Sequence, residues 1–187
     1  MDVKKFLFSL VICTAFFSFA TCNAAQVRLS NISAETFLQK MTIMLQTDTM
    51  KSACPIAITG LIRDEKSDLP NYGLTAWSAL FAGDASSPPE GFVAYYVDSS
   101  GCVHSMKFVF KVNDNWADKY RNIMLSTLWA LDFTPEQAAQ LVKGGKTENG
   151  VYTSDLHIAA HGKTYIIIMT NSNDMVTTLL LATDGGK

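Results

Sequence analysis

The clearest hydrophobic pattern lies near the C-terminal end of the chain, in Val151–Asp184. Over its first ten residues the side chains alternate: Tyr152, Leu156, Ile158 and Ala160 fall on one parity, and Thr153, Asp155 and His157 on the other. A period of two is typical of a β-strand with one buried and one solvated face. His161-Gly162-Lys163 and the polar run Asn171–Asp174 provide turn residues. The stretch therefore predicts a meander of three strands that needs helices to cover it.

A second alternating stretch predicts a hairpin with arms Phe92–Asp98 and Val103–Val112. Gly101 stands in the intervening turn, where a left-handed residue is favoured. In the second arm, His104 and every second residue up to Val112 are expected to face the core. The residues between them are expected to face solvent, and they include Ser105, Lys107 and Lys111.

Three segments have the spacing of amphipathic helices. In Ala34–Gln46 an apolar stripe begins at Phe37 and continues through Met41, Met44 and Leu45, with Ser33 placed to cap the helix. The second helix is Trp116–Leu131, preceded by the capping run Asn113-Asp114-Asn115. The third starts at Thr134-Pro135-Glu136-Gln137, a capping-box sequence, and ends at Gly144-Gly145.

The segments between the first helix and the hairpin are less regular. Ile56–Arg63 is expected to be a strand, and Asp64–Asn71 and Gly83–Gly91 are expected to be loops. Tyr72–Phe81 is predicted to be a strand, although the spacing of its apolar residues also suits a helix. The element order predicts an α+β fold: a largely antiparallel sheet of about seven strands with two to three amphipathic helices packed on one face.

Two stretches about 60 residues apart resemble one another. Each begins after a glycine, Gly91 or Gly150, and each ends in Asn-Asp, at 113–114 or at 173–174. The predicted helices do not align at that spacing, so the match is treated as coincidence unless the two halves of the sheet correspond.

Residues 1–24 have the features of a secretory signal peptide, which leaves residues 25–187 as a single domain. Lys4-Lys5 precede the apolar run Phe6–Phe19, and Cys22-Asn23-Ala24 offers small residues at a cleavage site. The run is shorter than the ~20 residues that a membrane-spanning helix needs, so we expect cleavage and export to the periplasm or the exterior. Cleavage after Ala20 is an alternative. Lipidation at Cys22 is disfavoured because Phe19-Ala20-Thr21 is a poor approach to a lipidated cysteine.

The charge balance argues against a nucleic-acid partner. The whole chain carries a formal net charge of −2, and loss of Asp2, Lys4 and Lys5 leaves 13 basic against 16 acidic residues, a net charge of −3. A nucleic-acid-binding domain would need a basic surface.

Two cysteines, Cys54 and Cys102, remain after cleavage at the predicted site. In an oxidising compartment they are expected to form a disulfide. The alternative is a nucleophilic Cys102 assisted by His104, which is disfavoured because no neighbouring residue offers an electropositive setting and a third orienting group.

No metal site or cofactor is expected. Asp155, His157 and His161 share a parity, but His161 would lie about 13 Å along the strand from His157 at about 3.3 Å per residue, too far for one ion. The sequence contains no nucleophile elbow, phosphate-binding glycine loop or zinc-protease motif.

These observations favour a small exported binding protein over an enzyme, with an unidentified protein or small molecule as its partner. The candidate binding residues are three large amphipathic side chains and two polar ones: Trp77, Tyr95, Tyr96, Asp155 and His157. No catalytic residues are assigned. The alternative is a small exported hydrolase or isomerase in which carboxylates or His157 line a pocket on the sheet.

Overall fold

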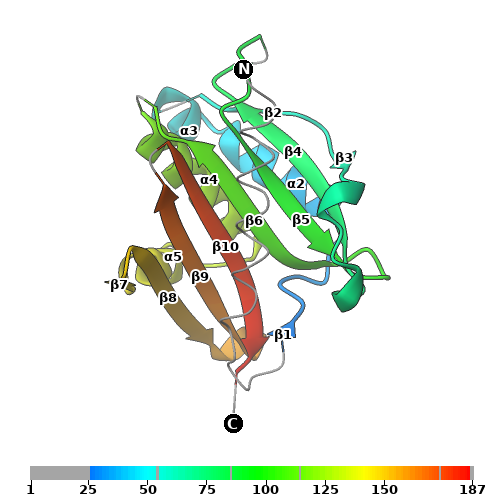
Figure 1. Ribbon diagram of the computed structural model, residues 1–187. Helices are drawn as coiled ribbons and strands as arrows, with labels where there is room; N and C mark the ends of the chain where they lie inside the picture. The colour runs from blue at the N-terminus through cyan, green and yellow to red at the C-terminus, as the bar shows by residue number, and fades with distance from the viewer. Residues whose placement is uncertain (1–25, 54, 85, 114, 173, 186–187) are drawn as a thin grey trace.

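The computed structural model describes residues 26–53, 55–84, 86–113, 115–172 and 174–185. They form an antiparallel sheet of ten strands in the order β2-β4-β5-β6-β10-β9-β8-β7, with β1 beside β10 and β3 beside β4 (Figure 1). Six strands are long: β4 Thr75–Ala82, β5 Gly91–Val97, β6 Val103–Lys111, β8 Val151–Ile158, β9 Lys163–Ser172 and β10 Met175–Asp184. Four are short: β1 Gln26–Val27, β2 Ala57–Ile58, β3 Ile62–Arg63 and β7 Lys146–Glu148. The predicted α+β class and antiparallel sheet are confirmed.

The short strands explain why the sheet has more strands than the sequence suggested. The expected single strand Ile56–Arg63 is two two-residue strands, β2 and β3, both paired with β4. Between them the Thr59 hydroxyl accepts a hydrogen bond from Leu80 N at 2.9 Å, in the place of a backbone carbonyl. This side-chain contact interrupts the ladder. Tyr72–Phe81, for which a helix was also open, is mainly strand, as β4.

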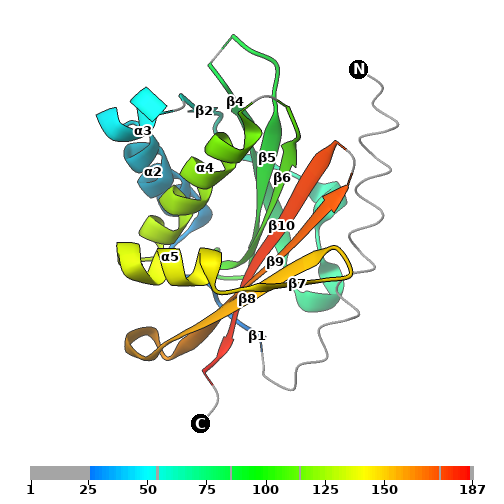
Figure 2. The same cartoon turned by 90° about the vertical axis from the view of Figure 1, so that its left-hand side faces the viewer.

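The α-helices pack on one face of the sheet (Figure 2). They are α2 Ala34–Leu45, α3 Asp48–Ala53, α4 Trp116–Ala130 and α5 Pro135–Lys143. The Ser33 side chain accepts from Thr36 N, and Thr134 and Gln137 form the predicted capping box. The predicted side-chain cap of α4 is not present at Asn115, whose backbone is left-handed (φ 65°). A capping side chain needs an extended backbone to reach the first turn, so Asn115 makes no such bond.

Two similar halves meet in the middle of the sheet. The meanders β4-β5-β6 and β8-β9-β10 each follow helices, and their last strands, β6 and β10, lie side by side (Figure 1). β9 begins 72 residues after β5, and β10 begins 72 residues after β6. The 60-residue match in the sequence instead pairs the hairpin β5–β6 with β8–β9, which are not equivalent in this order. The topological correspondence is therefore separate from that match.

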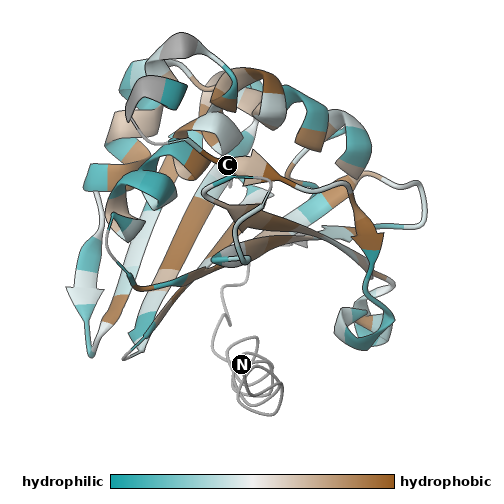
Figure 3. Cartoon of the chain, turned by 90° about the horizontal axis from the view of Figure 1, so that it is seen from above, coloured by the Kyte–Doolittle hydropathy of each residue, from teal (hydrophilic) through white to brown (hydrophobic). Residues whose placement is uncertain are grey.

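The main core lies between the helices and the sheet (Figure 3). It includes fully buried side chains from α2, α4 and the central strands: Phe37, Met41, Ile123, Leu128, Val93, Tyr95, Met106, Phe108 and Leu180. Burial of several such side chains, at about 1.5–3 kcal/mol each, holds the two layers together.

Strand β6 corrects one expectation from the sequence. Ser105 and Lys107 were expected to be solvated, but both are buried, as is Val109 on the same parity. Only Lys111 of that set is exposed. β6 lies in the centre of the sheet, between β5 and β10, so its second face is flanked by side chains of both neighbours. Polarity alternates along this strand, but exposure does not.

Candidate functional site

The face of the sheet opposite the helices is rich in apolar side chains. We call it the helix-free face because the four α-helices pack on the other side, and we define it by two rows of paired residues that cross the strands. At its β4–β5 side it is partly covered by the segment of the 3₁₀ turns Glu65–Ser67 and Pro70–Tyr72, where Leu69 packs on the sheet (Figure 2). One row is Ser78, Ala94, Lys107, Leu179, Ile168 and Thr153. The other is Leu80, Phe92, Val109, Thr177, Thr170 and Val151. Leu181 and Ile166, which pair with one another, extend the apolar area beside the first row.

Lys107 is the charged residue in the middle of this face. It is only 9% exposed, and its row neighbours are Ala94 and Leu179. Its ammonium makes no hydrogen bond or ion pair with the described residues. Its Nζ is not one of the buried polar atoms that lack a partner, so the stem of the side chain is covered while the ammonium reaches solvent.

Two buried hydroxyl groups lie near Lys107. Ser105, two residues earlier on the same face of β6, is 0% exposed, and its Oγ has no hydrogen-bond partner in the described chain. Ser78 Oγ, on the far side of Ala94 in the same row, is also buried without a partner. Buried polar groups are rarely left unsatisfied, and such groups call for a specific explanation. Sequence analysis missed this cluster because Ser78 and Lys107 come together only through the strand register.

Of the predicted aromatic candidates, only Tyr96 faces this side. It pairs with Ser105 and belongs to a small apolar cluster with Leu74, Ala76 and Ala94. Tyr95 faces the helices, where its hydroxyl donates to Met41 Sδ at 3.3 Å. Burial raises the pKa of the Tyr95 phenol. Trp77 pairs with Tyr95 on that same side, with the Arg63 guanidinium 6.0 Å from its ring centre.

Asp155 and His157 lie on the helix-free face, at its β8 side. Both are exposed, and His157 Nδ1 is 3.3 Å from Thr164 Oγ1 on β9. β8 is three strands from β6, which places Asp155 about 14 Å from the Lys107 backbone at about 4.8 Å per strand. The five predicted binding residues are therefore not brought together in one site.

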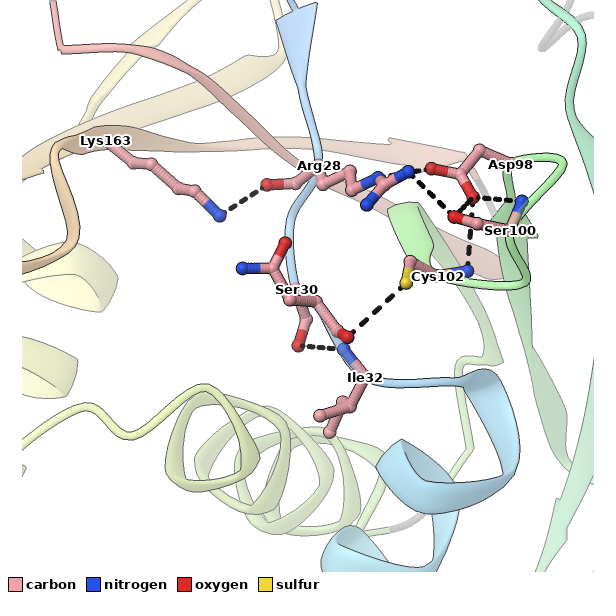
Figure 4. Close-up of polar contacts among 8 residues, drawn as sticks. Arg28, Ser30, Ile32, Asp98, Ser100, Cys102 and Lys163 are labelled. Carbon is pink, nitrogen blue, oxygen red and sulfur yellow. Dashed lines mark hydrogen bonds and ion pairs between the residues drawn. The ribbon is translucent and has the colours of Figure 1, made fainter.

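The turn between β5 and β6 holds a separate polar cluster (Figure 4). Arg28 pairs with Asp98 and donates to Ser100 Oγ at 2.7 Å, while Asp98 also accepts from the backbone N of Ser100 and Cys102. Burial would raise the pKa of Asp98, but hydrogen bonds from Ser100, Arg28 and Cys102 hold this pKa below its usual value. Arg28 and Asp98 are 70 residues apart, so no local pattern revealed the pair.

Cys102 lies within this cluster with its thiol donating to the Asn31 carbonyl at 3.4 Å. Two residues on, His104 is partly buried, and its Nδ1 has no hydrogen-bond partner among the described residues. Desolvation lowers the pKa of His104, Asp98 opposes that shift and Arg28 adds to it. The thiol contact is with a carbonyl, and a carbonyl does not activate a nucleophile.

The predicted disulfide stays a prediction. Cys102 is a free thiol with respect to the described residues, and Cys54 lies outside them. Two described residues near the cysteines in sequence, Ala57 and Val97, lie at opposite ends of β4. Ala57 pairs with Ala82 at one end, and Val97 pairs with Thr75 at the other. The predicted signal peptide and Cys22 also lie outside the described residues.

Within the described ranges, no group of three or more His, Cys, Asp or Glu side chains is arranged to hold a metal ion. No helix among them has the length and apolar character needed to cross a membrane. In comparisons with known proteins, no family model, curated protein or solved structure matches the chain.

Proposed function

We propose that the protein is an exported binding protein whose ligand contacts the helix-free face. The observation that carries the proposal is the pair of buried hydroxyl groups of Ser78 and Ser105 beside the two apolar rows, which lack partners among the described residues. Leu179, Ile166 and Ile168 are partly exposed on this face, and such apolar side chains are found on interaction surfaces. The N-terminal sequence supports export.

The enzyme alternative has less support. It needs Asp155 or His157 to line a pocket, but both side chains are exposed on β8, and His157 interacts with Thr164. Neither side chain is therefore enclosed as the enzyme alternative requires.

The two segments expected to be loops, Asp64–Asn71 and Gly83–Gly91, are also less favoured as binding sites than the sheet. In the Gly83–Gly91 segment, Asp84 accepts hydrogen bonds from Ser86 and Ser87. These bonds lower the pKa of Asp84 to about 2, and the side-chain bond from Ser86 has the largest effect. Glu90 pairs with Lys119 of α4. In the other segment, Asp68 accepts from Ala76 N and pairs with Arg63. Asp84, Glu90 and Asp68 are therefore already paired within the fold.

The test uses protein recovered from its exported fraction and a neutral apolar dye, Nile red. We expect saturable dye binding that is lost in Ile168→Glu, because a charge would then lie in the apolar row. The matched control is Ile43→Glu on α2, where the side chain is 57% exposed on the helix layer. Absence of dye binding, or equal loss in both variants while both stay folded, would contradict the proposal. The intact mass of the same sample tests cleavage before Ala25 and the state of Cys102.

A further inference from the structure

We propose that two copies of the chain join through the open edge of β8, so that their sheets become continuous across a two-fold axis at Leu156. β8 lies at the outer side of the sheet, where the short strand β7 covers only part of it (Figure 1). The contact lies at the edge of the sheet and is independent of what the helix-free face binds.

The edge of β8 is open over the second half of the strand. β7 pairs with Val151–Thr153, and no other described strand pairs with β8 on this side. Ser154–Ile158 therefore have β9 as their neighbour on one side and no described strand on the other. This stretch contains no proline or lysine, the residues that commonly protect a sheet edge. An unprotected edge is a template for pairing with another chain.

The turn between β7 and β8 sets the direction of the backbone groups. Asn149-Gly150 has positive φ at both positions (50° and 78°), as in a two-residue type I′ turn. The flanking pair Glu148 and Val151 then exchanges backbone hydrogen bonds across the hairpin, and every second residue of β8 points its N–H and C=O the same way. Asp155 and His157 share that parity, so their backbone groups point out of the open edge.

The side chains on this edge select one register for the pairing. An axis at Leu156 places Asp155 of each copy opposite His157 of the other, as a pair that exchanges backbone hydrogen bonds. An axis at Asp155 would instead place two carboxylates opposite one another, and like charges in that position are destabilising. An axis at His157 would leave both carboxylates without an imidazole. Only the axis at Leu156 matches every acidic side chain with a donor.

His157 has a ring nitrogen available for this contact. Its Nδ1 lies 3.3 Å from Thr164 Oγ1 of the same chain, and its Nε2 has no partner among the described residues. When Nδ1 accepts a hydrogen bond from the Thr164 hydroxyl, Nε2 carries the proton and donates to Asp155 of the second copy. The Asp155 carboxylate is exposed and has no partner within the described chain, so it is free to accept.

The helices above the edge do not coincide in this register. The C-terminal end of α5 reaches β8 near Ser154, because Gly144 lies beside Ser154 Oγ. Ser154 would lie opposite Ile158 of the second copy, so the two α5 ends would be offset by about 13 Å along the strands at about 3.3 Å per residue. Between them, the buried Leu156 of one copy would meet Leu156 of the other on the helix side of the sheet.

The experiment measures association by analytical ultracentrifugation of protein recovered from its exported fraction. We expect a monomer–dimer equilibrium. His157→Asp places carboxylates opposite one another and Asp155→His removes the acceptor, so each should weaken the dimer by about tenfold or more. An equimolar mixture of these two variants restores both Asp–His pairs and should form a heterodimer with an affinity near that of the wild type. The matched control is Thr147→Asp, which adds an acidic group at an exposed position of β7 and should leave the affinity unchanged.

A wild-type protein that sediments only as a monomer would overturn the proposal. Single variants that dimerise as tightly as the wild type would also overturn it, and so would an equal weakening by Thr147→Asp. Circular dichroism checks that each variant is folded, and failure of the folded variants to form the heterodimer would overturn the register. Asp155→Asn keeps the shape of the side chain and should weaken the dimer as well, so it provides the test if a charge variant does not fold.

Discussion

The sulfur of Met41 connects three elements of the core, and its hydrogen bonds can be tested directly. Tyr95 Oη of β5 lies 3.3 Å from Met41 Sδ, and Thr127 Oγ1 of α4 lies 3.6 Å from it. The Thr127 hydroxyl also lies 2.8 Å from the Ile123 carbonyl, so it has another acceptor. Met41 Sδ is the acceptor for the hydroxyl of Tyr95, whose side chain is 0% exposed. The perturbation to study is therefore Met41→Leu, alone and with Tyr95→Phe.

The expected magnitudes follow from packing and hydrogen bonding. Met and Leu have similar volumes, so the packing cost of Met41→Leu should be below about 1.5 kcal/mol. The variant also leaves the buried Tyr95 hydroxyl without an acceptor, which adds about 1–2 kcal/mol. Tyr95→Phe alone should change stability by less than about 1 kcal/mol, because a thioether is a weak acceptor. When Tyr95→Phe is already present, adding Met41→Leu should cost only its packing term.

The assay is urea unfolding of the four proteins at pH 7. The double-mutant cycle should give a coupling energy of about 1–2 kcal/mol between positions 41 and 95, with similar m-values in all four. Additivity within about 0.5 kcal/mol would refute the reasoning, because it would mean that the Tyr95 hydroxyl does not depend on the sulfur. A loss above about 2 kcal/mol in Tyr95→Phe alone would refute the assumption that the bond is weak.

Three further predictions concern a cap and two titrating groups. Thr134→Ala should destabilise the protein by about 1 kcal/mol in urea unfolding through loss of the α5 capping box, and Thr134→Ser should cost less. Because the pKa of Asp98 is lowered in the folded state, its contribution to stability is present above the unfolded pKa and is lost as pH falls through the folded value. The Asp98→Asn variant should thus be less stable than wild type at pH 7. In urea unfolding at decreasing pH, the difference in unfolding free energy between the two proteins should shrink below about pH 4. A difference of constant size would contradict this. Burial, with a smaller effect of Asp132, raises the pKa of Tyr165 to about 12, so its contribution is full below about pH 10 and is lost as pH rises through 12. Ultraviolet titration of wild type should show a late phenolate step that is missing in Tyr165→Phe.

Most of the long strands could be predicted from the sequence, because parity is a local property. The β8–β9–β10 meander and the β5–β6 hairpin follow the alternating stretches closely. The same local signal failed for the solvent-facing side of β6. The sequence pattern shows that Lys107 is polar, but its burial follows from the position of β6 between β5 and β10. That position depends on pairing with a strand some 70 residues away.

The candidate site was harder to predict for the same reason. Asp155 and His157 were expected to be solvated and are exposed, but Tyr95 and Trp77 face the helices. The unpartnered groups Ser78, Ser105 and Lys107 are brought together by the register of β4, β5 and β6. A sequence pattern gives the face of each residue along one strand. It does not give its neighbour on the next strand.

The central position of β10 has a consequence for the order of folding. Among the described strands β10 is the last in chain order, yet it joins the two halves through β6 and β9 and also pairs with β1, near the opposite end of the described chain. These pairings give the sheet a high contact order, which slows folding. Until Asp184 is available, the two meanders have no shared strand to join them. A chain that emerges from a ribosome or a secretion channel N-terminus first would therefore complete this sheet only after Asp184 had been released.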